Sequence, residues 1–565
     1  MSRPCWIHPT LSLFTSTVLV ALLAPAVQPA HAAPNTTQVQ AASEAAAPKL
    51  VVVMVIDGLP AEQLQRYRHQ FGQGGLRRLM EQGASFTNAH QAHGVTVTAI
   101  GHTAVLTGAY PYRHGIIGNN WIDGSGRLVY CTEDTRHRYI GEETDEHDGT
   151  SPANLRVDTL GDQLRYASGN RSKVVTVSGK DRGAILLAGK TGTAYMFMDK
   201  TGDFASSTWY MQQHPAWVER FKAAKPQDRY YGKSWKPLLA DSAYADDAPD
   251  PAPSATSPNR FAFTFHSESG APAADYYARL KTSPAVDELT LDFARAAIEG
   301  ENLGSNASGA TDLLGISLSG HDYVNHAYGP ESRMSHDHLQ QIDRRIADFF
   351  NYLDKRIGMD KVLVVLTADH GFANTAEFSQ GRRMDAARIA PKPLMAKLEA
   401  ALADRFRIAG LVKNSYLPEI YLDYAAIERN KLARVEVEDA AARFLLTQPG
   451  IADVYTRTQL EQGVASKSRV GTLMQRAWNR QLSGDLMVVT APYTSFGSGS
   501  SGATHGTPYN YDSNVPLLMM GGRWIRPGVQ AGYTEVVDIA PTLAQILRLR
   551  PPAAAEGRVL TEALR

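Results

Sequence analysis

Apolar runs alternate with amphipathic segments along most of the chain after residue 48. Four of these runs are rich in β-branched residues and almost free of polar ones, which is typical of strands buried on both faces of a sheet. Segments 157–167 and 336–357 repeat their apolar residues with helical spacing instead. The alternation predicts an α/β fold with a mostly parallel sheet flanked by helices. The four predicted strands are residues 49–57, 172–178, 311–319 and 361–369.

Two stretches interrupt the alternation. Residues 209–277 are rich in proline, aspartate, alanine and aromatic residues, and residues 391–482 carry helix and strand signals of their own. We interpret both as insertions, or a cap, on one main domain that spans residues 49–565.

The first 32 residues resemble a signal peptide. The apolar run of residues 11–27 follows Arg3, and the small residues around Ala32 fit a cleavage site there. The run is short for a membrane span and is broken by Pro25, although an uncleaved anchor stays a second interpretation. Residues 33–48 form the predicted linker. We therefore expect an exported protein, periplasmic or secreted, with no transmembrane anchor after cleavage and with Cys131 as its one remaining cysteine.

The balanced charge of the chain does not indicate a strongly charged partner. The chain has 57 basic and 57 acidic residues and a formal net charge of +0. No global field therefore favours nucleic acid or an acidic surface. The oligomeric state is not readable from the pattern, so partners have to be inferred from a site.

Charged residues follow all four predicted strands. In open α/β sheets, chemistry collects at the carboxyl ends of the strands. A lone aspartate at such a position is usually a helix cap or turn residue, but here acids, histidines and cations recur at each strand end. A helix that began near Asp322 would place Asp322 and His326 on one face. The strand-end residues are Asp57, Lys180, Asp181, Arg182, Asp322, His326, Asp369 and His370.

Carboxylates and imidazoles in this arrangement suit Zn²⁺. We expect Asp57, Asp369 and His370 to share one ion. Asp322, His326 and a third histidine would hold another, and His505 in its glycine-rich loop is the candidate for that histidine, although His321 competes for the ligand role. Two such ions clamp the attacking and leaving oxygens of a phosphoryl transfer. The alternatives are a structural metal and an ordinary polar core.

A hydrolytic site of this kind needs a nucleophile. Thr98 lies where the predicted helix of segment 98–108 begins, and helix N-termini favour anions. Thr96 lies two residues upstream on the same side of the predicted strand. Threonine in a strand is more often plain β-branched packing, and the residues alone leave the choice between Thr96 and Thr98 open.

Six motifs together resemble, in this order, the site motifs of the alkaline phosphatase superfamily. They are "VIDG", "TVTAIGHTAVLTGAYPYRHGIIGNNW", "SGKDRGA", "GHDYVNHAYGP", "TADHG" and "THGTPYNYDSNVPLL". The similarity is greatest to its threonine-nucleophile branch, which includes the phosphate-irrepressible bacterial alkaline phosphatases and, further off, the nucleotide pyrophosphatase/phosphodiesterases. It covers about residues 49–200, 283–380 and 482–565, and implies an alkaline-phosphatase-like core with inserted cap segments.

Together with the predicted signal peptide, the resemblance implies an exported phosphomonoesterase with two Zn²⁺ ions per chain. Thr98 matches the nucleophile, which becomes phosphorylated and is then released by a zinc-bound water. Asn119 matches an amide donor to a phosphoryl oxygen, with Asn120 as the plainer turn residue beside it. One ion would lie among Asp57, Thr98, Asp369 and His370, and the other among Asp322, His326 and His505.

Lys180 and Arg182 match the pair that contacts the remaining phosphoryl oxygens in the monoesterase branch. A monoester dianion carries one more negative charge than a diester, so additional cations favour it selectively. We therefore expect small-molecule phosphate monoesters as substrates. A phosphodiesterase of the same superfamily is the leading alternative, and an inactive zinc- or phosphate-binding relative is the second. The Cys/Ser-x-Pro-x-Arg motif of sulfatases does not occur at Thr98 or at Cys131.

Overall fold

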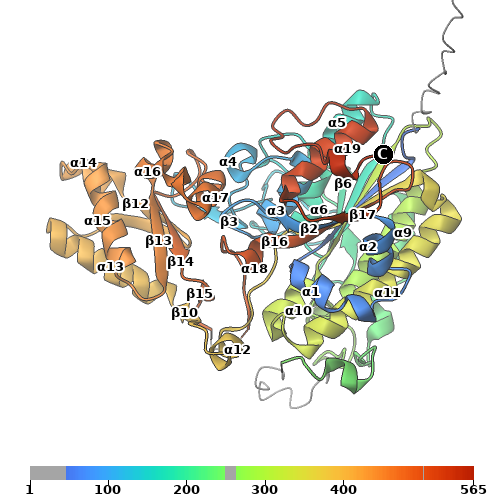
Figure 1. Ribbon diagram of the computed structural model, residues 1–565, viewed down its shortest axis with the longest axis horizontal. Coiled ribbons are helices and arrows are strands. Elements are labelled where there is room, and N and C mark those ends of the chain that lie inside the picture. The colour runs from blue at the N-terminus through green and yellow to red at the C-terminus, as the bar shows by residue number, and fades with distance from the viewer. Residues whose placement is uncertain (1–45, 249–262, 500–501) are drawn as a thin grey trace, which may run out of the picture. The chain divides into compact units, whose positions relative to one another are not determined.

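The computed structural model describes residues 46–248, 263–499 and 502–565. The predicted signal peptide and most of the predicted linker lie outside these residues. A ten-stranded sheet forms the core of the described chain, in the order β17-β2-β16-β9-β1-β8-β5-β6-β7, with β18 paired to β2 (Figure 1). The strands are β1 Leu50–Ile56, β2 Ala84–His90, β5 Val174–Ser178, β6 Thr193–Phe197, β7 Phe204–Ala205, β8 Asp312–Leu318, β9 Val362–Thr367, β16 Asn514–Met520, β17 Gly528–Gln530 and β18 Thr534–Glu535.

The centre of the sheet is parallel. Strand β1 pairs in parallel with β8 and β9, and β5 pairs in parallel with β8 and β6. All residues of β1, β8 and β9 are buried, which explains their nearly continuous apolar sequence. These strands and β5 are the four predicted ones, and the predicted α/β fold with a mostly parallel sheet is confirmed. Strand β16, antiparallel to both β9 and β2, was not predicted.

Two groups of helices cover the sheet (Figure 1). Helix α9 packs against β8 and β5 and contacts α10 and α11, whereas α6 packs against β5 and β6 and contacts α3. The predicted helix of residues 336–357 is α11, and that of residues 157–167 is α5, which starts later because Thr159 caps it. The helices are α1 Ala61–Arg66, α2 Leu76–Gln82, α3 Thr98–Thr107, α4 Pro111–His114, α5 Leu160–Ala167, α6 Asp181–Ala188, α9 Pro284–Glu301, α10 Gly320–Tyr328, α11 Arg333–Arg356, α12 Ala376–Gly381, α18 Asn510–Ser513 and α19 Ile539–Leu547.

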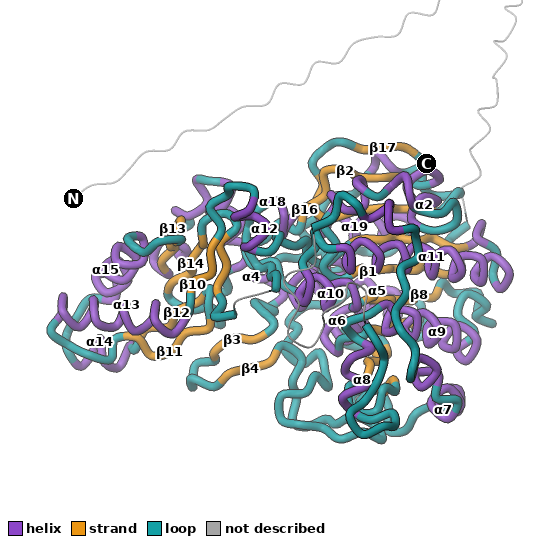
Figure 2. The backbone as a smooth tube through the Cα atoms, turned by 90° about the horizontal axis from the view of Figure 1, so that it is seen from below, coloured by secondary structure: helices purple, strands orange, loops and turns teal. Residues whose placement is uncertain are grey.

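An inserted lobe builds a second, smaller sheet in the order β11-β12-β14-β13 (Figure 2). Its helices enclose a separate apolar core around Leu398, Ile420 and Leu445. A further apolar cluster joins Ile100 of the main domain to Tyr455 of the lobe. The elements are α13 Pro391–Phe406, β11 Val412–Tyr416, β12 Glu419–Leu422, α14 Tyr424–Arg429, α15 Arg434–Leu446, β13 Ile451–Thr456, α16 Arg457–Glu461, α17 Arg469–Ala477 and β14 Leu486–Thr490. Strand β14 lies beyond residue 482, the predicted end of the insertion. The predicted domain boundaries stay predictions.

The described residues of the earlier interrupting stretch pack along helix α9 and form mainly loops and short helices. Trp217 of α7 lies against Phe293 of α9, with ring centroids 5.2 Å apart. The helices of this stretch are α7 Ala216–Ala223 and α8 Ala274–Leu280. Small strands elsewhere are β3 Asn120–Ile122, β4 Leu128–Tyr130, β10 Ala387–Ile389 and β15 Thr494–Phe496. Of the helices that the structure describes, none has the length and apolar character needed to cross a bilayer.

Candidate active site

The parallel strands deliver the predicted site residues to one edge of the sheet. Asp57 directly follows β1, and Asp369 and His370 follow β9. Helix α10 begins just after β8 and carries Asp322 in its first turn. His326 is one turn further along that helix, as predicted from the four-residue spacing. The side chains of Asp57, Asp369 and His370 are completely buried.

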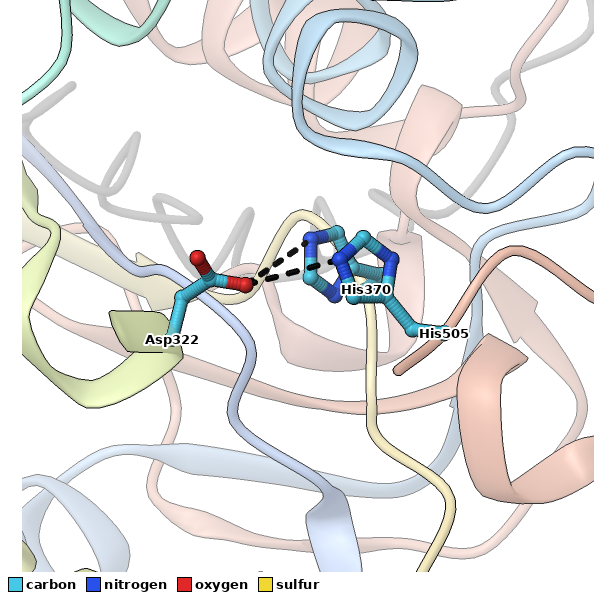
Figure 3. Close-up of side chains that lie close together, drawn as sticks. All are labelled: Asp322, His370 and His505. Atoms are coloured by element: carbon cyan, nitrogen blue, oxygen red, sulfur yellow. Dashed lines mark ion pairs between the residues drawn. The ribbon is translucent and has the colours of Figure 1, made fainter. Parts of the chain in front are cut away.

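Asp322 is the centre of an acid–histidine cluster. Its Oδ1 lies 3.4 Å from His326 Nε2 and 3.8 Å from His370 Nε2. His505 arrives from the loop before α18, with its Nε2 3.5 Å from the same oxygen. Figure 3 shows His370 and His505 stacked beside Asp322, with their ring centroids 3.5 Å apart. Ligand atoms held tetrahedrally at about 2.0–2.1 Å from Zn²⁺ are roughly 3.3 Å from one another, so these spacings suit metal ligands.

A second group of acids adjoins the first. His370 Nε2 lies 3.5 Å from Asp57 Oδ1 and 3.4 Å from Asp369 Oδ2. The ligand atoms of Asp57, His102 and Asp369 all lie within 4.8 Å of one another, and so do those of Asp322, His370 and His505. His370 is therefore within reach of both groups. The predicted division of the ligands between two ions stays a prediction.

The donor atoms fit a metal. Within the described residues, Asp57 Oδ1, Asp369 Oδ2 and His370 Nε2 are buried without a hydrogen bond, although buried polar atoms normally have one. The opposite ring nitrogens of the histidines are engaged: His370 Nδ1 donates to Gly371 O at 2.9 Å, and His505 Nδ1 donates to Thr96 O at 2.8 Å. These bonds leave Nε2 of each ring as a lone-pair donor that faces the acids.

Burial and neighbouring charges shift the pKa values of these acids in different directions. Burial, reinforced by the charge of Asp369, raises the pKa of Asp57 well above its ordinary value. Although burial opposes it, the cations of Lys180 and His326 lower the pKa of Asp322. Burial lowers the pKa of His370 to about 3, which keeps its imidazole neutral. Three close carboxylates and a neutral imidazole are a ligand set for a divalent cation.

Thr98 is the first residue of helix α3, as predicted, and its side chain is buried. Val97 at the N-cap makes no side-chain cap bond, and the positive end of the helix dipole favours an anion beside Thr98. Asn119 accepts a hydrogen bond from the Ala99 N–H through Oδ1 at 2.9 Å, which leaves its NH₂ group to donate elsewhere. Thr96, in contrast, donates its hydroxyl to Thr507 O at 2.8 Å.

Lys180 connects the acids to Thr98. Its Nζ lies 2.8 Å from Asp57 Oδ2, 2.5 Å from Asp322 Oδ2 and 3.5 Å from Thr98 Oγ1. Burial disfavours the charged amine, but the two carboxylates outweigh it and raise the pKa of Lys180. Arg182 lies further out and donates to Tyr130 OH at 3.2 Å. Lys180 and Arg182 line one cavity of about 780 Å³.

The two competing residues turn away from the cluster. His321 Nε2 lies 2.8 Å from Gln63 Oε1, and its Nδ1 faces His338 Nδ1 at 3.2 Å. Asn120 accepts a hydrogen bond from Tyr416 OH at 3.2 Å.

His102 was not assigned a role from the sequence. It is fully buried in α3, where its Nδ1 donates to Thr98 O at 2.9 Å and lies 3.1 Å from Asp369 Oδ2. Its Nε2 is 2.8 Å from Ser317 Oγ. The four-residue spacing from Thr98 was the available signal. Gly101 lies on the same helix, and a Cβ there would come within 2.0 Å of Asp369 O, so the close approach of α3 to Asp369 requires glycine.

Comparison with known proteins places this arrangement in a family. The family model described as type I phosphodiesterase / nucleotide pyrophosphatase matches residues 51–510. A Myroides odoratus protein named calcium-transporting ATPase is 35% identical over 534 residues, which are 92% of this chain and 95% of that protein. Alkaline phosphatase PhoV of Synechococcus elongatus is 35% identical over 533 residues, which are 92% of this chain and 94% of PhoV.

Comparison with solved structures supports the same family. A crystal structure of wild-type alkaline phosphatase PafA matches with a TM-score of 0.84 and 32% sequence identity, over 92% of this chain and 100% of that one. The chain therefore belongs to the type I phosphodiesterase / nucleotide pyrophosphatase family, within the alkaline phosphatase superfamily. The resemblance inferred from the six motifs is confirmed.

Proposed function

We propose that this chain is an exported, zinc-dependent alkaline phosphatase that hydrolyses phosphate monoesters through a phosphothreonine at Thr98. The observation that carries the proposal is the position of Lys180, whose Nζ is within 3.5 Å of Thr98 Oγ1 beside a buried cluster of acids and histidines. The similarity to proteins named alkaline phosphatase over 92% of the chain supports it. Two Zn²⁺ ions, a signal peptide and a periplasmic or secreted location belong to the same proposal.

The chain's own groups account for the transfer. Thr98 Oγ1 loses its proton and attacks the phosphorus atom, the ester P–O bond breaks, and the leaving oxygen takes up a proton, so the alcohol departs as phospho-Thr98 forms. Water then attacks the phosphorus of phospho-Thr98, which releases phosphate and restores the hydroxyl. Bound zinc would supply positive charge for the attacking and leaving oxygens, held by Asp57, Asp369 and His370 and by Asp322, His326 and His505.

Asn119, Lys180 and Arg182 would hold the nonbridging phosphoryl oxygens. The amide of Asn119 is aligned by its bond to the Ala99 N–H in the first turn of α3. Charge-assisted donors at these oxygens stabilise the transition state most where the negative charge is greatest. A monoester dianion, with its three nonbridging oxygens, therefore gains more from Lys180 and Arg182 than a diester does.

The deciding experiment compares kcat/KM on p-nitrophenyl phosphate and bis-p-nitrophenyl phosphate for the zinc-loaded protein. We expect the monoester to be preferred, and the double variant Lys180→Ala/Arg182→Ala to lose that preference. The variant Lys355→Ala/Arg356→Ala is a matched control, because both of its residues are exposed near the end of α11.

A preference for the diester that does not depend on Lys180 and Arg182 would instead support the phosphodiesterase alternative. Tight zinc binding with no turnover of either substrate would support an inactive relative. Export is tested separately, by fractionating cells and sequencing the N-terminus of the mature chain, where cleavage after Ala32 is expected.

A further inference from the structure

Three cavities adjoin the site, and the smallest, of about 160 Å³, is lined by His326, His505 and Arg388, which is paired with Glu377. The other two differ in their lining. Lys180 and Arg182 line the larger one, together with Tyr323. A smaller cavity of about 330 Å³ is lined by Asn119, His326 and His505. The lobe contributes to the smaller cavity through the turn at residues 416–419 and through β14. Lys180 and Arg182, which we propose bind the phosphoryl group, therefore line a different cavity from His326 and His505.

The lining of the smaller cavity is mostly apolar. Among the described residues that line it there is no lysine or arginine, and its one carboxylate belongs to Glu419. That carboxylate is 6% exposed and is engaged by the Gly484 N–H at 3.2 Å and by the Tyr421 hydroxyl at 2.5 Å. The apolar lining residues include Val95, Val97, Ile117, Leu417, Met474 and Val489. Apart from His326 and His505 at the site itself, the lining offers an anionic group no basic side chain, so desolvation of such a group there would be unfavourable.

We propose that this cavity is the subsite for the alcohol portion of the substrate, and that it selects monoesters of uncharged, apolar or aromatic alcohols. The inference rests on the proposed function. With nonbridging oxygens held by Lys180 and Arg182, which line the larger cavity, the ester oxygen would face His326 and His505, which line this one. A volume near 330 Å³ lies at the lower end of the range for ligand pockets, so it suits a single ring or a short chain.

Tyr416 is the residue to which we assign the selection. It ends strand β11 and presents a 41% exposed ring to the cavity. Its hydroxyl donates to Asn120 Oδ1 at 3.2 Å, which ties the lobe to the residue next to Asn119. A ring fixed in this way provides a rigid face for an aromatic or alkyl leaving group.

The first test uses three substrates that share an alkyl phosphate bond: methyl, benzyl and 4-carboxybenzyl phosphate. The far carboxylate of the third leaves the reacting bond almost unchanged. We expect kcat/KM for benzyl phosphate to exceed that for 4-carboxybenzyl phosphate by about tenfold or more. Equal values for the two would overturn the inference. No hydrolysis of any of the three, methyl phosphate included, would count against the proposed function instead.

The second test identifies the residue responsible for the selection. Its readout is kcat/KM for benzyl phosphate divided by kcat/KM for methyl phosphate, a ratio in which the fraction of folded enzyme cancels. Tyr416→Ala should lower this ratio about tenfold, whereas Tyr416→Phe, which keeps the ring, should preserve it. Tyr166→Ala is the matched control, because Tyr166 is 52% exposed on α5. An equal loss on both substrates in Tyr416→Ala would contradict the role in selection.

A charge introduced into the cavity gives an independent readout. Leu417→Lys places an ammonium group in the lining and should raise the kcat/KM ratio of 4-carboxybenzyl to benzyl phosphate at least about tenfold. An unchanged ratio in this variant would show that the alcohol portion lies elsewhere.

Discussion

The side-chain oxygen Oδ1 of Asn119 accepts a hydrogen bond from the Ala99 N–H at 2.9 Å. Ala99 follows Thr98 in the first turn of α3, so the bond fixes the Asn119 amide relative to the hydroxyl that we propose as the nucleophile. Only the NH₂ group of that amide remains free to reach a phosphoryl oxygen. The side chain is thus aligned before any substrate arrives.

Asn119→Ala should lower kcat/KM on p-nitrophenyl phosphate by roughly a hundredfold, as is typical when one aligned donor to a transition-state oxygen is lost. Asn119→Asp keeps the acceptor for Ala99 but replaces the donor with a charge that repels the phosphoryl group, so it should be at least as damaging. Asn351→Ala is the matched control, because Asn351 is exposed on α11. Comparable losses in the Asn119 and Asn351 variants would refute the assignment.

Thr98 and Thr96 provide a test of the nucleophile. Thr98→Ala should reduce kcat by at least about a thousandfold, and Thr98→Ser should keep a measurable part of the activity. Thr96→Ala loses the bond to Thr507 O and should affect mainly stability. Acid quenching during turnover of ³²P-labelled substrate, followed by peptide mapping, should locate the label at Thr98. A label on another residue would identify that residue as the nucleophile instead.

The strand-end residues show how much of the site the sequence predicted. Asp57, Asp369 and Lys180 were predictable because each follows a run that is apolar on both faces, and parallel strands end at one edge. The helix start at Thr98 followed from its local sequence. His505 was placed from its glycine-rich loop and from the family resemblance, and the structure brings it to 3.5 Å from Asp322.

Residues whose roles arise from packing were not predictable. His102 lies in the interior of α3, and only the approach of that helix to Asp369 reveals the contact between the two residues. Strand β16 was missed because a short apolar run does not by itself distinguish an antiparallel strand from a buried helix segment. In the small sheet of the lobe, β14 pairs with β12 and β13, which lie far from it in the sequence, and local patterns do not specify such pairing.

Removal of metal should abolish activity and lower the Tm. Asp57, Asp322 and Asp369 are buried close together, so without bound cations their repulsion and unmet ligand atoms destabilise the folded state. Dialysis against a chelator, followed by addition of Zn²⁺, should first remove and then restore both the activity and the Tm. An enzyme that stays fully active after exhaustive chelation would contradict the metal site.

Metal stoichiometry tests the ligand assignment without relying on turnover. His505→Ala should bind about one zinc fewer per chain than the parent when measured by atomic emission. His321→Gln is the control, because His321 faces Gln63 and not the cluster, and its zinc content should match that of the parent. The opposite pattern would make His321 the ligand.

Asp287 of α9 provides a pH-dependent contribution to stability outside the ligand set. Burial raises the pKa of Asp287 from 3.8 to about 7. Its Oδ1 accepts a hydrogen bond from the Gly320 N–H at 2.9 Å, at the start of the helix that carries Asp322, and its Oδ2 faces His338 Nε2 at 3.3 Å. The folded state therefore retains a proton between about pH 4 and 7 that the unfolded state has lost, so this group's contribution to stability decreases as the pH rises through that window.

Asp287→Asn keeps the acceptor for Gly320 and removes the titration. The stability of the variant relative to the parent should therefore increase by about 1 to 4 kcal/mol between pH 5 and pH 8, because one pKa unit corresponds to about 1.4 kcal/mol. Chemical denaturation of the metal-loaded proteins at each pH measures this difference in stability. Asp348→Asn, at an exposed position of α11, is the control, and its stability relative to the parent should not change with pH. Parallel curves for the parent and Asp287→Asn would show that Asp287 stays ionised in the folded protein, with Lys180 close enough to stabilise its charge.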